Sequence, residues 1–136
     1  MVDIAVQPIL MGNASLTFGA DGYQAHVSSA TFTPTSSVVT WKGLSPAAVF
    51  SFGANATWTL DLELAQDWET ASALSRYLYE NEGQTVAVVF EPVDGGASVT
   101  ADVIITPGAI GGAVDAVATA TVSLGVQGRP LLSAIA

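Results

Sequence analysis

The sequence contains no cysteine and little charge. Without cysteine there are no disulfides, thiolate metal sites or cysteine nucleophiles, and folding in a reducing cytoplasm is the natural fit. Only 11% of the 136 residues are charged, whereas about 25% is typical of soluble domains. Apolar residues make up 50%, so little charge remains to cover the surface of one domain. We therefore expect part of that surface to be buried against partners.

Positive charge is the scarcest feature. The chain has twelve acidic residues and only three basic ones, Lys42, Arg76 and Arg129, so its net charge is −9. Nucleic-acid binders need a basic stripe that displaces counterions from phosphates. Three scattered bases cannot form one, so we expect the chain to repel DNA.

Long apolar runs are also missing. A membrane-spanning helix needs about 20 consecutive apolar residues, and the longest stretches here, such as 86–90, are much shorter. The first residues, 1–4, carry an acid and no base, so we expect no secretory leader and no membrane insertion.

Most of the chain has the pattern of β-strands. Alternating segments at 15–19 and 23–33 flank Asp21-Gly22, a hairpin turn signal. The strand 57–64 places its leucines on one face and Asp61 and Glu63 on the other. Further strands are expected at 37–42, 85–91, 98–106 and 115–127.

One segment has helical spacing instead. Apolar residues recur at helical intervals across 68–80, with Asp67 as the expected N-cap and Gly83 as the stop. The sequence thus predicts one mainly β, antiparallel domain over 1–136, sandwich-like or barrel-like, with one flanking α-helix.

Three segments fall outside this pattern. Residues 1–11 and 128–136 are apolar and arm-like, and 43–56 form a long connection without one charge. Long connections are usually functional or disordered, and this one is too apolar for disorder. We expect it to contact a partner, although it could instead fold back on its own core. The stretch 107–114 is a smaller case with the same two interpretations.

No residue pattern predicts catalysis. His26 is the single histidine and has no cysteine or second histidine with which to form a zinc site. Asp61 and Glu63 share a strand face at about the spacing of paired glycosidase carboxylates, but their exposed neighbours are threonines rather than sugar-stacking aromatics. We expect no enzyme activity, no cofactor and no metal.

Two stretches resemble the major tail (tail tube) proteins of long-tailed bacteriophages. One runs from Leu62 to Pro92: an amphipathic strand, Gln-Asp-Trp, one helix ending Tyr-Leu-Tyr-Glu, then Gly-Gln-Thr-Val-Ala-Val-Val-Phe-Glu-Pro. The other runs from Thr106 to Pro130: Thr-Pro-Gly-Ala-Ile-Gly-Gly-Ala-Val-Asp, a threonine-rich strand, then Val-Gln-Gly-Arg-Pro. The resemblance covers about residues 57–130 and rests on the general residue pattern of these segments rather than on an active-site signature.

The resemblance implies two antiparallel sheets with a flanking helix. Six subunits would close a ring around a lumen, and rings would stack into a tube through which phage DNA passes without specific binding. Long loops and terminal arms would bridge subunits and rings. The implied partners are further copies of the chain and other tail proteins at the tube ends. The implied location is the virion tail, made and assembled in the host bacterial cytoplasm.

These expectations single out two sets of residues. An acidic, threonine-rich strand face would line the lumen and repel phosphate, unless it faces outward to solvent. Its first candidates are Thr57, Thr59, Asp61 and Glu63, and its second are Thr119, Thr121 and Ser123. The candidates for contacts between subunits are Leu44, Val49, Phe50, Phe52, Ile110 and Arg129.

Two other classes of function stay open. The chain could be another virion part, namely a tail terminator, a baseplate ring or a capsid decoration protein. It could also be a carbohydrate-binding β-sandwich, which needs an exposed aromatic platform. We expect Trp41, Trp58 and Trp68 on core faces or in the helix, which argues against that platform.

Overall fold

A computed structural model describes residues 1–133 as nine β-strands and one short helix. The mainly β, antiparallel fold with one helix is therefore confirmed. The elements are β1 (Ser15–Phe18), β2 (Asp21–Gly22), β3 (Val27–Thr35), β4 (Val38–Lys42), β5 (Val49–Gly53), β6 (Thr57–Ala65), α1 (Leu74–Glu80), β7 (Thr85–Glu91), β8 (Val99–Ile104) and β9 (Thr119–Leu132).

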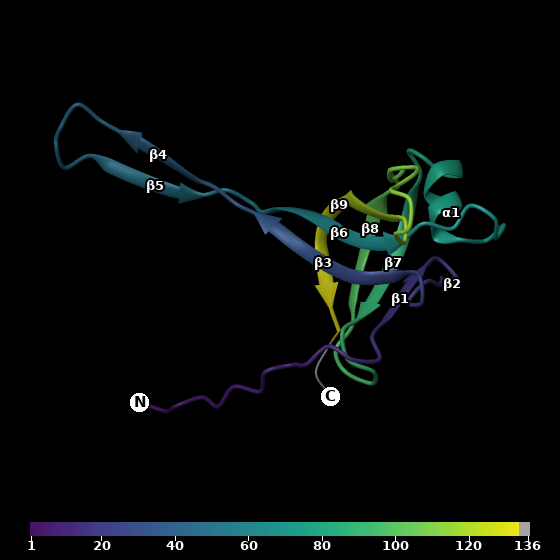
Figure 1. The fold of residues 1–136 in the computed structure, drawn as a ribbon. Helices are drawn as coiled ribbons and strands as arrows, with labels where there is room; N and C mark the ends of the chain where they lie inside the picture. The colour runs from purple at the N-terminus through teal and green to yellow at the C-terminus, as the bar shows by residue number, and fades with distance from the viewer. Residues whose placement is uncertain (134–136) are drawn as a thin grey trace.

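Seven strands form one curled sheet in the order β2-β1-β7-β8-β9-β6-β3. The sheet curls into a half-barrel with α1 at one end (Figure 1). Its strands are continuous, so the barrel-like alternative describes it better than two separate sheets. The remaining strands, β4 and β5, pair only with each other.

The core follows from period-two patterning. On β6, Leu60, Leu62 and Leu64 are buried, and the residues between them are more exposed. On β9, Ala120, Val122 and Leu124 alternate in the same way. Each fully buried leucine contributes about 1.5–3 kcal/mol relative to an exposed one. The inner face of the half-barrel is thus filled mainly by aliphatic side chains, together with Phe18, Tyr23 and Phe90, and α1 adds Leu74 and Leu78.

The helix is shorter than the sequence predicted. It begins at Leu74, and the expected N-cap Asp67 instead closes a separate turn. The Asp67 carboxylate accepts hydrogen bonds from the backbone N–H groups of Glu69 and Thr70 at 3.1 and 3.2 Å. Asp, Thr and Ser compete for backbone hydrogen bonds and favour turns over helix interiors. Residues 68–73 therefore lie outside the helix.

The predicted hairpin at Asp21-Gly22 is displaced. These two residues form β2 and pair with Phe18 and Thr17, so the chain turns at Gly19, whose φ of 63° suits a glycine. The next strand, β3, begins only at Val27 and pairs with β6 rather than with β1. The strand at 23–33 was thus placed several residues too early.

The expected long loop at 43–56 is also wrong, because it contains strand β5. Residues 38–53 form an antiparallel hairpin, with Val38 opposite Gly53 and Lys42 opposite Val49. The last strand is shifted as well: β9 starts at Thr119 rather than 115 and runs to Leu132. Residues 128–132 are therefore part of the sheet, not of an arm, and 134–136 lie outside the described residues. Residues 1–11 form neither helix nor strand and are exposed.

Candidate assembly surfaces

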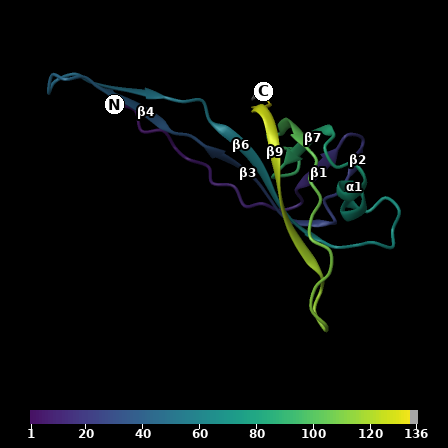
Figure 2. The ribbon, with the colours of Figure 1, turned by 90° about the horizontal axis from the view of Figure 1, so that it is seen from above.

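The β4–β5 hairpin projects far from the half-barrel (Figures 1 and 2). Side chains alternate between its two faces, and one face is apolar throughout. We call this the aromatic face, formed by Val39, Trp41, Phe50 and Phe52. The Trp41 and Phe50 rings lie opposite each other with centroids 6.0 Å apart, yet Trp41 is 60% exposed and Phe52 is 62% exposed. Trp41 was expected on a core face, and that expectation is wrong.

The other face of the hairpin is more polar. It carries Val38, Thr40 and Lys42 on β4 and Ser51 and Val49 on β5. The Thr40 and Ser51 hydroxyls hydrogen-bond across the ribbon at 3.2 Å. Val49 thus lies on the opposite face from Phe50 and Phe52, while Leu44 stands fully exposed in the turn.

Nothing in the described part of the chain covers either face of this hairpin, since both strands are exposed along their whole length. An isolated two-stranded hairpin is at best marginally stable in water. Large exposed apolar surfaces usually mark interaction sites. The hairpin therefore has the composition of an interface without its partner.

A second apolar projection is the N-terminal arm, residues 1–11. Val2, Ile4 and Val6 are strongly exposed, and the arm meets the sheet at Gly12, which bridges to Val93. In both views the arm and the hairpin extend from the same side of the half-barrel, and α1 lies on the opposite side (Figures 1 and 2). The two apolar projections thus lie at one end of the molecule and the helix at the other.

Ile110 and Arg129 lie apart from the hairpin. Ile110, 67% exposed, borders a hollow of about 160 Å³ that we call the helix hollow, lined by Trp68, Arg76, Tyr79, Glu80 and Ile110. Arg129 lies where β9 bulges against β8, beside Gly128 with φ of 77°, and it lines a shallow hollow with Trp58 and Asn55. The predicted contact residues therefore occupy three places rather than one.

The two sets of lumen candidates share one face of the sheet. Because β6 and β9 pair, Asp61 lies opposite Ser123 and Glu63 lies opposite Thr121, on the side turned away from the core. Asp61 accepts hydrogen bonds from the Ser123 and Thr33 hydroxyls at 2.6 and 3.0 Å. We call this surface the acidic face. Strand β3 adds three residues that the sequence analysis missed: Ser29, Thr31 and Thr33.

Lys42 lies on the hairpin and Arg76 in α1, whereas Arg129 lies on β9 itself, at the bulge, where it lines a hollow with Asp102. The part of the face around Asp61 and Glu63, formed by β3, β6 and residues 119–123 of β9, carries hydroxyls and carboxylates and no base. Such a surface presents hydrogen-bonding groups to water and repels phosphate.

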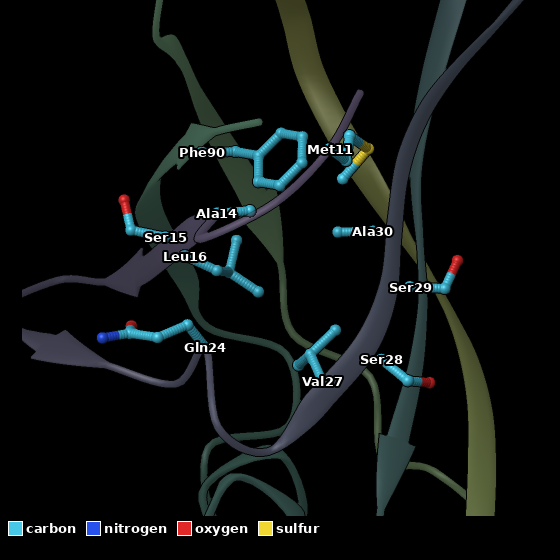
Figure 3. Close-up of a pocket in the computed structure, with 10 residues that line it drawn as sticks. All are labelled: Met11, Ala14, Ser15, Leu16, Gln24, Val27, Ser28, Ser29, Ala30 and Phe90. Carbon is cyan, nitrogen blue, oxygen red and sulfur yellow. The ribbon is translucent and has the colours of Figure 1, made fainter. Parts of the chain in front are cut away.

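The half-barrel stays open because its edge strands, β2 and β3, do not pair with each other, and residues of β1 and β3 line the opening. A small pocket of about 60 Å³ lies there. Figure 3 shows Leu16 and Val27 pointing toward each other into it, with Met11 at its mouth beside Phe90 and Ala14. The base of the N-terminal arm thus covers this opening.

Within residues 1–133 no three His, Asp or Glu side chains converge on a point where a metal could bind. His26 stacks edge-on against Tyr23, with ring centroids 5.6 Å apart. Burial raises the pKa of the Tyr23 hydroxyl, and Asp21 adds to that effect. The helix of the described residues is too short to cross a membrane.

No protein-family model matches the sequence, and comparison with curated proteins gave no match.

Proposed function

We propose that the chain is a structural subunit that assembles with copies of itself into the tail tube of a long-tailed bacteriophage. In this proposal six subunits form a ring, rings stack, and phage DNA passes through the lumen. The observation that carries the assembly is the projecting hairpin, whose aromatic face is not covered by any of residues 1–133. The choice of tail tube within that class rests on the sequence resemblance.

The acidic face supports the conduit. Six copies, with a net charge of −9 each, together have a formal charge of −54. A wall of carboxylates and hydroxyls repels DNA at close range. In the proposed tube the acidic face lines the lumen, with Asp61 and Glu63 as its charged groups. The alternative, an outward-facing acidic surface, leaves DNA passage insensitive to those two residues.

Negative-stain electron microscopy of the purified, concentrated protein tests the proposal. Hollow tubes or stacked six-fold rings are the expected result. Closed trimers would favour a capsid decoration protein, and one ring size that never stacks would favour a tail terminator or a baseplate ring. Monomers at every concentration in sedimentation velocity would contradict self-assembly.

The exposed Trp41 also supplies an aromatic surface of the kind that a carbohydrate-binding protein needs, so that alternative function has one observation in its favour. Ligand sites combine such surfaces with a few convergent polar groups that fix orientation. On the hairpin, the Trp41 and Phe50 rings are flanked by Val39 and Phe52 instead. Assembly therefore remains the favoured function, and a quench of Trp41 fluorescence by oligosaccharides would reverse that preference.

A further inference from the structure

The helix hollow has the size and lining of a socket for one aromatic side chain. Its volume is about 160 Å³, and its apolar walls come from Trp68, Tyr79 and Ile110. An apolar protein cavity of about 150 Å³ is large enough to bind benzene. The helix hollow is open to solvent, so the phenyl ring of a phenylalanine matches it in volume and can enter it from the surface.

Arg76 gives this hollow a cationic wall. Its Nη1 donates to the Trp68 carbonyl at 3.0 Å and its Nη2 donates to the Glu80 carboxylate at 3.2 Å. Its Nε is buried and has no hydrogen-bond partner among the described residues. A guanidinium fixed in this way attracts the face of an aromatic ring, so the hollow favours an aromatic occupant over an aliphatic one.

The hairpin offers such rings, but not to its own hollow. The hairpin and α1 lie at opposite ends of the molecule (Figures 1 and 2). The charges of the two ends are complementary: residues 36–56 carry Lys42 and no acid, whereas 67–82 carry four acids and only Arg76. Aromatic residues at the centre of an interface supply most of its affinity, and charges at the rim guide association.

We propose that the aromatic face of one copy docks on the helix hollow of a second copy, with the Phe50 ring in the hollow. This inference rests on the proposed function and names the partner surface of the hairpin. The two surfaces differ, so the contact is head-to-tail and each bound pair leaves one free hairpin and one free hollow. Such contacts extend into open-ended assemblies unless a rotation closes them.

Two pairs of single variants test the contact in sedimentation velocity and negative-stain microscopy. Phe50→Ser removes the docking ring, and Val38→Ser is its control on the opposite face of the same ribbon. Ile110→Glu places a carboxylate in the hollow, and Val114→Glu is its control at an exposed position that does not line it. Phe50→Ser and Ile110→Glu should weaken end-to-end growth at least about tenfold. The controls should extend as the wild type does.

Mixing the two impaired variants gives the decisive result. Phe50→Ser keeps a hollow and Ile110→Glu keeps a hairpin, so the mixture should form a species twice the size of either variant that does not extend. Normal growth of Ile110→Glu, or no doubled species in the mixture, would overturn the head-to-tail contact while leaving self-assembly standing. A wild type that stays monomeric at all concentrations would overturn both.

Discussion

The hairpin can be removed without loss of the core, and this gives the sharpest separation of folding from assembly. The Ala54 N–H donates to the Ser37 carbonyl at 2.9 Å, so the two strands are still paired where the hairpin begins. Replacing residues 38–53 by Asn-Gly would close this pair with a favoured two-residue turn. The replaced segment contributes no residue to the buried core.

The expected effect on stability is small and of known sign. If the hairpin behaves as a flexible loop, shortening the connection about eightfold lowers the entropic free-energy cost of closing it by about 2 kcal/mol. If the hairpin is instead ordered by its own hydrogen bonds, the gain is smaller. For a domain of this size, about 2 kcal/mol raises the melting temperature by several degrees. The variant should therefore melt at the wild-type temperature or slightly above it.

Circular dichroism melting is done on dilute samples in which sedimentation velocity finds the wild type monomeric, so that assembly adds nothing to its stability. Negative-stain microscopy of concentrated samples then measures assembly separately. We expect a folded subunit that forms no tubes. A melting temperature lower by about 10 °C would mean that the hairpin stabilises the subunit itself, which would refute the reasoning from its exposure. Tubes of normal length would refute its role in assembly.

Three further results are expected. Leu62→Ala, in the core, should lower the free energy of unfolding in urea by about 2–5 kcal/mol, whereas Thr59→Ala on the same strand should change it little. Asp67→Ala should lower the melting temperature at pH 7, because hydrogen bonds from the Thr70 hydroxyl and N–H, and then from the Glu69 N–H, hold the pKa of that carboxyl below its ordinary 3.8. The stabilisation belongs to the charged form, so the difference from wild type should disappear as the pH falls below about 3.8; a difference that persists in acid would contradict it. Phage particles whose tubes carry Asp61→Lys and Glu63→Lys should deliver their DNA more slowly than wild-type particles, because the lysines would bind phosphate as it passes; unchanged delivery would place the acidic face outside the lumen.

The sequence predicts best where one face of a strand is buried. On β6 the alternation of leucines with Asp61 and Glu63 gave both the strand and its faces, because burial on one side forces period two. The common face of Asp61 and Ser123 could not be predicted, because it depends on which strands pair across the sheet. The threonines of β3 were missed for the same reason.

The hairpin failed as a prediction because both of its strands are exposed along their whole length, so no buried face marks them. β5 reads Val-Phe-Ser-Phe-Gly, too short and too uniformly apolar to separate a strand from an apolar loop. Trp41 was expected on a core face, but the strand that carries it is exposed along its whole length. The helix was overestimated for a local reason: Trp68 and Ala71 fit helical spacing, but the turn at Asp67 competes for the same backbone groups.

The hairpin also bears on how load would travel through an assembly. β4 follows directly from β3, and β5 leads directly into β6, so a pull on the tip acts along both strands at once. The next strand, β9, pairs with β6 from Thr59 to Ala65. Antiparallel hydrogen bonds run perpendicular to the strands, so this pull shears the ladder and its bonds must fail together rather than one after another. A subunit pulled by its hairpin is thus loaded along its strands, the direction in which the hydrogen bonds between β6 and β9 share the force.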